Sequence, residues 1–197
     1  VAAVCLDACK MAKECGITVS CDLNYRKNLW TTEQAKATME RLLEYVDILI
    51  ANEEDAEKVL GISAPDTDVT AGKLNKEGYV SVAKQICRKY GIPTVAITLR
   101  QSISASDNNW SGMLYTNDTA YFSREYAVHL VDRVGGGDSF GAGLIFAIGH
   151  GFEPQKCIDY AVAASCLKQT MEWDVNLSTE KEIMTLVNGD GSGRVQR

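Results

Sequence analysis

The first half of the chain repeats one pattern, in which a helical stretch precedes a short apolar segment that ends in polar residues. The apolar segments are residues 17–21, 47–51 and 94–99. Strands that alternate with helices form parallel sheets whose faces the helices cover. Ligands of such sheets bind beyond the carboxyl ends of the strands. The sequence therefore predicts an α/β fold with its site at that edge of the sheet.

Capping signals predict where several helices begin and end. Thr31 with Gln34 and Thr179 with Glu182 each match a capping box, which marks a helix start. Glycine is favoured just after the last turn, because it adopts a left-handed backbone without strain. The glycines expected to end helices are Gly16, Gly61 and Gly91.

The pattern changes after residue 109 to short strands joined by polar turns. Residues 110–115, 120–122 and 126–131 are the expected strands, and they predict an antiparallel edge on the parallel sheet. Helices are expected after them, over residues 138–148, 154–170 and 179–187.

The composition fits one soluble domain that spans residues 1–197. With 46% hydrophobic residues the chain can build an ordinary core. Its formal net charge of −6 provides no general field that attracts nucleic acid. An anionic ligand would therefore have to be held by local groups.

The cysteines indicate a reducing compartment. There are seven, without a C-x-x-C pair, which argues against a disulfide framework and a zinc site. Cys5, Cys9 and Cys15 occupy apolar helical positions, so we expect them to be buried thiols. No apolar run reaches the roughly 18 residues of a membrane span and no signal peptide is evident, so we expect a cytoplasmic protein.

Three consecutive glycines between an apolar strand and a helix give the strongest local signal. Gly135, Gly136 and Gly137 leave room for backbone N–H groups to face one point, where the helix N-terminus adds positive charge. Asp138 follows in the first turn, where a carboxylate could accept a hydroxyl proton. Asp also favours helix starts, and glycines also mark plain turns, so the spacing alone leaves both interpretations open.

Residues 132–143, Asp-Arg-Val-Gly-Gly-Gly-Asp-Ser-Phe-Gly-Ala-Gly, resemble the second signature of the ribokinase-like (PfkB) carbohydrate kinases. The resemblance implies a ribokinase-like fold, ATP and Mg²⁺ as cofactors, Asp138 as the catalytic base, and an anion hole at Gly135, Gly136 and Gly137. Arg133 stands where that family usually has Thr.

Further segments resemble the same family in the expected order. Residues 52–55, Asn-Glu-Glu-Asp, are similar to the N-x-x-E segment, which implies that Asn52 lies near the nucleotide and that Asp55 acts indirectly on magnesium. The strand end at residues 98–99 resembles the nucleotide loop, although two glycines are replaced. An Ala-rich helix at residues 161–164 implies an adenine contact, although such a face is more commonly core. The remaining implied nucleotide contacts are Thr98, Arg100, Ser102, Ser104 and Val162.

Residues 22–30 follow the pattern D-x-N-x-R-x-x-L-W, which resembles 2-keto-3-deoxygluconate kinases and also fructokinases of the family. A guanidinium can grip a sugar-acid carboxylate, which makes Arg26 the candidate. The resemblance implies nucleotide contacts at Asn24 and Tyr25 and a second sugar contact at Asp174. Exposed loop charges are the alternative for Arg26 and Asp174. Residues 103–110 favour the bacterial keto-deoxygluconate group.

The resemblance covers nearly the whole chain but only the C-terminal part of a family member. The family's N-terminal strands and β-sheet lid, which commonly mediates dimers, have no counterpart before Val1. We therefore expect the parent to be a homo-oligomeric kinase of 2-keto-3-deoxygluconate. A fructokinase or ribokinase, and for this piece a nucleotide-binding module without activity, are the alternatives.

Overall fold

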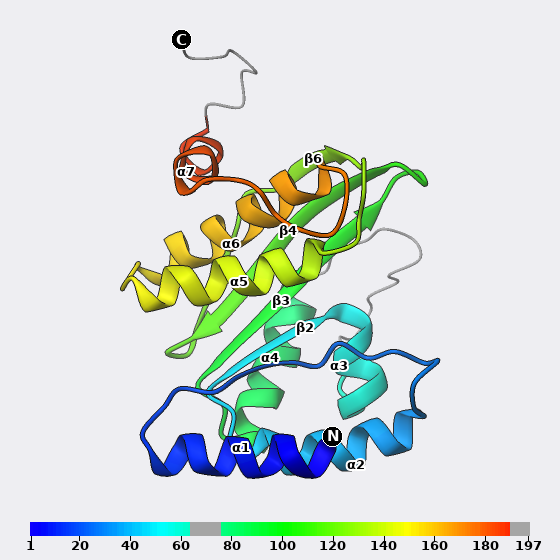
Figure 1. The fold of residues 1–197 in the computed structure, drawn as a ribbon, viewed down its shortest axis with the longest axis vertical. Helices are drawn as coiled ribbons and strands as arrows, with labels where there is room; N and C mark the ends of the chain where they lie inside the picture. Colours follow the sequence, from blue (N-terminus) through cyan, green and yellow to red (C-terminus); the bar gives the residue numbers. More distant parts are fainter. Residues whose placement is uncertain (64–75, 190–197) are drawn as a thin grey trace. The chain divides into compact units, whose positions relative to one another are not determined.

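The computed structural model describes residues 1–63 and 76–189, which form two compact units. Unit 1 comprises residues 1–99 and 113–120, and unit 2 comprises residues 100–112 and those from 121 onward. The strands follow the order β1-β2-β3-β4-β5, and β6 pairs with β4 (Figure 1). The division between the units falls within strands, because β3, β4 and β5 each contribute residues to both.

Unit 1 contains parallel strands with helices between them. β1 and β2 pair in parallel, as do β2 and β3, so that Asn52 at the carboxyl end of β2 lies beside Thr98 of β3. This arrangement confirms the predicted parallel sheet. The elements are α1 (Ala2–Glu14), β1 (Ser20–Asp22), α2 (Thr32–Leu43), β2 (Ile48–Asn52), α3 (Glu53–Leu60), α4 (Lys76–Tyr90) and β3 (Thr94–Ser102).

Local signals set the ends of these helices as predicted. The Thr31 side chain accepts a hydrogen bond from the Gln34 backbone, and the Gln34 side chain accepts one from the Thr31 backbone, which completes the capping box. Gly61 ends α3 in the left-handed conformation, with φ of 67°. The core of unit 1 is built from side chains such as Leu43, Leu49 and Ile86, all completely or almost completely buried.

Helix α1 differs from the prediction in what it buries. Leu6 is its buried residue, whereas the apolar residues Val4 and Met11 of the same helix are 71% and 63% exposed. Cys5 and Cys15 are exposed and Cys9 is half-buried, so the prediction of three buried thiols is wrong. Helical spacing identifies a face that could be buried, but Leu6 is the only buried one among the described residues of α1, the helix that contacts α2.

Unit 2 combines an antiparallel strand pair with three helices. β4 pairs antiparallel with β6, from Asp107 opposite His129 to Trp110 opposite Tyr126, which confirms the predicted antiparallel edge. The Thr179 and Glu182 capping box is also present. The elements are β4 (Asp107–Thr116), β5 (Thr119–Phe122), β6 (Tyr126–His129), α5 (Gly136–Gly149), α6 (Pro154–Gln169) and α7 (Glu180–Val187).

Helices α5 and α6 pack closely side by side (Figure 1). A side chain at Gly143 of α5 would lie 3.1 Å from the Ala161 Cα, so the missing Cβ allows the two backbones to approach. Phe140 and Leu144 of α5 are fully buried, as is Val162 of α6. This contact fixes the N-terminal end of α5 against the C-terminal end of α6.

Most element limits agree with the sequence, with two extensions that concern the site. β3 continues to Ser102 rather than ending at Leu99, and α5 begins at Gly136 rather than Asp138. The sequence also predicts a polar loop after Gly61 through about residue 79, and a flexible end over residues 188–197. α4 begins at Lys76 instead, and residues 64–75 and 190–197 lie outside the described residues. No helix among the described residues is long and apolar enough to cross a membrane.

Candidate functional site

Residues 132–137 lie between β6 and α5 and include the first two residues of α5; they are called the glycine loop below. Gly135 has φ of 79°, a conformation that residues with a side chain rarely adopt. A Cβ at this position would also overlap the backbone oxygen of Asp174. Gly135 therefore allows both the turn of the loop and its close contact with residues 172–176.

The start of α5 leaves backbone amides at the surface. Its first helical hydrogen bond runs from the Ser139 N–H to the Gly135 oxygen, at 2.9 Å, so the amides of Gly137 and Asp138 precede it. Helix N-termini carry such unpaired amides together with a partial positive charge, and so attract anions. Gly137 and Asp138 are exposed, whereas the Gly136 N–H already donates to the Arg133 oxygen at 3.2 Å. An anion would meet Gly137 first among the three predicted glycines.

The last turns of α6 hold the glycine loop at both ends, through residues 165, 168 and 169. The Ser165 hydroxyl donates to the Gly136 oxygen at 2.8 Å, and the Lys168 Nζ donates to the Asp132 oxygen at 3.0 Å. The Gln169 oxygen accepts from the Asp132 N–H at 3.3 Å. None of these three α6 residues was predicted as part of the site.

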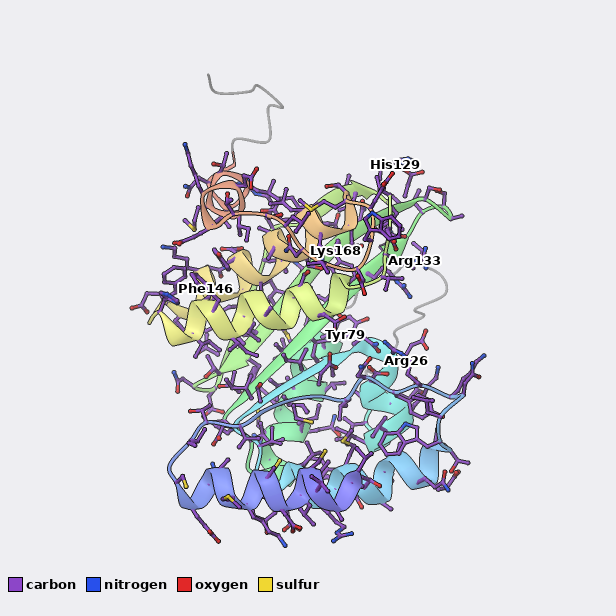
Figure 2. The ribbon with its side chains drawn as sticks, viewed as in Figure 1. Arg26, Tyr79, His129, Arg133, Phe146 and Lys168 are labelled. Atoms are coloured by element: carbon purple, nitrogen blue, oxygen red, sulfur yellow. The ribbon has the colours of Figure 1, made fainter. Side chains whose placement is uncertain are left out.

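Arg133, which departs from the family pattern, connects the glycine loop to residues 103–106. Its Nη2 donates to the Ala105 oxygen at 3.2 Å. The side chain is exposed and lies beside this loop (Figure 2). The arginine therefore ties together two backbone segments that sequence analysis placed at the nucleotide site.

A polar cluster fixes the turn between β3 and β4. Ser104 donates to one carboxylate oxygen of Asp107 at 2.7 Å, and the other oxygen lies 2.8 Å from the His129 Nδ1. The hydrogen bond from His129, followed by that from Ser104, lowers the pKa of Asp107. Ser104 is exposed, as is Ser102, and Arg100 is half-buried. The predicted nucleotide contacts of these three residues stay predictions.

Asp55 is a buried carboxyl group at the carboxyl end of β2 in unit 1. It is 4% exposed, and its pKa is raised to about 6, first by burial and then by the nearby charge of Asp22. The Arg26 charge and a hydrogen bond from the Tyr25 backbone act in the opposite direction. The structure therefore brings the 22–26 loop and the 52–55 segment together, as expected for one site.

The 22–26 loop has a fixed backbone and an exposed guanidinium. Asp22 Oδ1 accepts from the Asn24 N–H at 3.0 Å, and Asn24 has a positive φ of 39°. Arg26 is exposed and donates to the Tyr25 oxygen at 3.1 Å. Its guanidinium is therefore accessible to a ligand as well as close enough to Asp55 to influence its pKa.

Asn52 and Asp55 fit the start of α3. The Asn52 side chain caps α3 by accepting from the Asp55 N–H at 2.8 Å. The described residues contain no group of three or more His, Cys, Asp or Glu that could hold a metal ion. The Asp22 charge helps to raise the pKa of Asp55, and the two carboxyl groups are a donor set that fits Mg²⁺ bound largely through phosphates and water.

The remaining predicted residues differ in their exposure. Val162 is fully buried, and its Cγ2 lies 2.9 Å from where a Cβ of Gly112 would stand. An adenine ring would have to enter this packed region to contact Val162, and the contact stays a prediction. Thr98 is 8% exposed, whereas the Asp174 side chain is exposed. The sugar contact expected of Asp174 stays a prediction.

The strand order, the helices around the sheet and the glycine loop before α5 define a ribokinase-like α/β fold. Residues 1–172 match the sequence profile of the pfkB family carbohydrate kinases. The chain belongs to this family, as the motifs had indicated.

Three relatives are similar over most of the chain. The crystal structure of 2-dehydro-3-deoxygluconokinase from Thermotoga maritima is 51% identical, with a TM-score of 0.88 over 93% of this chain and 54% of that one. A PfkB family carbohydrate kinase from Listeria grayi is 33% identical, with a TM-score of 0.83 over 95% and 55%. The 2-dehydro-3-deoxygalactonokinase of Haloferax volcanii is 26% identical over 92% of this chain and 51% of its own length. The chain thus spans about half the length of these relatives.

Replacing Gly135 by Ala should damage the glycine loop. The new Cβ overlaps the Asp174 oxygen and imposes backbone strain, so the free energy of unfolding should fall by more than about 2 kcal/mol. Gly137→Ala is the matched control, because nothing lies within 4 Å of its Cβ position. Chemical denaturation of both variants measures the difference. Equal effects at the two positions would contradict the loop geometry.

Replacing Asp55 by Asn should change how stability depends on pH. The pKa of Asp55 is about 6 in the folded chain against an ordinary 3.8, so the folded state binds the proton more tightly. Below about pH 4 both states are protonated. Between about pH 4 and 6 the wild type loses stability that the Asn variant keeps.

Denaturation at several pH values checks this expectation. The unfolding free energy of Asp55→Asn minus that of the wild type should increase as the pH rises from 4 to 7. Glu57→Gln, on the same helix and exposed, controls for the loss of one charge. A difference that stays constant, or that decreases, would show that Asp55 is not a carboxyl group with a raised pKa.

Proposed function

We propose that the whole protein transfers the γ-phosphoryl group of ATP to 2-keto-3-deoxygluconate and forms the 6-phosphate, with Asp138 as the catalytic base. The observation that carries this proposal is the position of Asp138. Its carboxylate is exposed in the first turn of α5, next to backbone amides that no helical bond uses. Family membership and the name of the 51% identical relative support the same reaction.

The proposed chemistry follows from this arrangement. Asp138 accepts the proton of the attacking sugar hydroxyl as the oxygen forms a bond to the γ-phosphorus. The bond from that phosphorus to the bridging oxygen breaks, and ADP leaves with the electron pair. The amides at the start of α5, Gly137 foremost, stabilise the negative charge on the transferred group. Mg²⁺, when bound, neutralises charge on the phosphates.

The remaining binding roles follow the residues that sequence analysis singled out, and they are given for each unit by itself. In unit 1, Arg26 binds the sugar-acid carboxylate and Asp55 acts on magnesium through water. Asp174 of unit 2 contacts the sugar. The residues that contact the nucleotide are Asn24, Tyr25, Asn52, Thr98, Arg100, Ser102, Ser104 and Val162. Exposure of Arg26 and Asp174 supports these roles, because a ligand can reach both side chains.

Fructose or ribose is the alternative substrate within the family. An exposed Arg26 favours a sugar acid over a neutral sugar, because a guanidinium binds a carboxylate through paired, charge-assisted hydrogen bonds. A nucleotide-binding module without activity is the alternative from another class. The exposed Asp138 carboxylate argues against it, since phosphate binding alone would not need an acid at that position. A cytoplasmic, homo-oligomeric enzyme remains the expectation.

Replacing Asp138 by Asn in the whole protein should abolish the general base and leave the anion site in place. We expect kcat to fall by about 10²–10⁴ while the affinity for ATP changes little. A coupled assay of ADP release gives the rate, and titration calorimetry gives the affinity. A variant that keeps the wild-type kcat would remove Asp138 from the mechanism.

Replacing Arg26 by Met should discriminate between substrates. Loss of the charge-assisted pair is expected to lower kcat/KM for 2-keto-3-deoxygluconate about ten- to a hundredfold, with a much smaller loss for fructose. Lys27→Met, the exposed neighbour, is the control for the loss of one positive charge in the loop. Equal losses for both sugars would make Arg26 a nucleotide or structural residue.

A further inference from the structure

Lys168 is a lysine whose whole side chain is removed from solvent. It is 0% exposed, although it lies in the last turn of α6, where lysines usually reach water. The ion pairs found among the described residues do not include it. Burial of an ammonium group is costly unless other groups compensate for the lost hydration. The position of this charge therefore needs a physical reason.

The ammonium group is directed at the backbone of the glycine loop. Lys168 Nζ donates to the Asp132 oxygen at 3.0 Å. The C-terminal end of a helix carries partial negative charge, which favours a cation in the last turn of α6. The Asp132 carbonyl and the end of α6 are dipoles, so they stabilise the ammonium group without neutralising its charge. A net positive charge therefore remains beside the loop that carries the proposed anion site.

Asp132 is the residue through which this contact reaches the rest of the loop. Its own Oδ1 accepts from the Val134 N–H at 2.9 Å, and its N–H donates to the Gln169 oxygen at 3.3 Å. The oxygen, the N–H and the side chain of Asp132 thus each make a hydrogen bond, three residues before Gly135 with its left-handed conformation. Lys168 provides the charged member of this set, while Ser165 holds the far end of the loop at the Gly136 oxygen.

We propose that Lys168 is a positioning residue for phosphate binding. It is a cation built into the protein that fixes the glycine loop from its inner side and adds positive potential for the nucleotide phosphates. Lys168 acts through the loop backbone and does not touch the substrate. This inference rests on the proposed kinase function and assigns to that site a residue that the sequence motifs did not include.

Lys168→Met in the whole protein removes the charge with little change in volume. We expect kcat/KM for ATP to fall about tenfold to a hundredfold, through both a higher KM for ATP and a lower kcat, because the anion site loses its alignment. The KM for the sugar should stay within about twofold. Lys156→Met removes an exposed charge from the same helix and should leave all three constants unchanged.

Two further variants separate charge from structure. Lys168→Gln keeps a hydrogen-bond donor, so it should melt closer to the wild type than Lys168→Met does, yet show the higher KM for ATP. Lys168→Ala leaves space for the missing three carbons and the ammonium group. Propylammonium should therefore restore part of its activity, and equal concentrations of tetramethylammonium, which has no N–H, should not. Neither salt should stimulate the wild type.

The outcomes decide separately between this inference and the proposed function. A wild type that phosphorylates no sugar refutes the kinase proposal, and the inference about Lys168 falls with it. If the wild type is active and Lys168→Met has the same kcat and the same KM for ATP, the inference about Lys168 is overturned and the kinase proposal stands. The same holds if the variant loses only melting temperature, since a purely structural lysine would behave in that way.

Discussion

The contact between the last turns of α6 and the backbone of residues 131–136 is the interaction on which the rest of the site depends. The glycine loop adopts a left-handed turn at Gly135, and such a conformation persists when neighbours hold it. Ser165 and Lys168 bind its two ends through carbonyl oxygens, while the Gln169 oxygen accepts from Asp132. Because α5 begins directly after this turn, the same contacts orient the amides and the carboxylate at its start.

Each of the two units contains a buried ionisable side chain. In unit 1, burial and the charge of Asp22 raise the pKa of the Asp55 carboxyl group to about 6. In unit 2, the Lys168 ammonium group donates a hydrogen bond to the Asp132 backbone oxygen. Each lies next to a segment of the family signature and incurs a desolvation cost. Neither charge is explained by packing alone.

Sequence analysis predicted the features that depend on interactions between residues close together in the chain, such as the ends of helices. Thr31 and Gln34 cap α2 because their side chains need only each other's backbone, and Gly61 ends α3 for a similarly local reason. The place of Asp138 in the first turn of α5 also followed from neighbouring residues. The part played by Lys168 could not be predicted, since its partner lies 36 residues away and a helical lysine is normally exposed. The prediction that the α1 thiols are buried was wrong for a related reason, because an apolar face is buried only where a partner packs on it.

We have proposed that the whole protein phosphorylates a sugar acid. The most direct measurement is the kcat/KM of the whole protein with MgATP for 2-keto-3-deoxygluconate and, in parallel, for fructose and ribose. We predict phosphorylated product from the keto acid, with a kcat/KM at least about tenfold above that for either neutral sugar, because one charge-assisted pair provides a difference of that size. Efficient phosphorylation of fructose or ribose with a poor rate for the keto acid would contradict it.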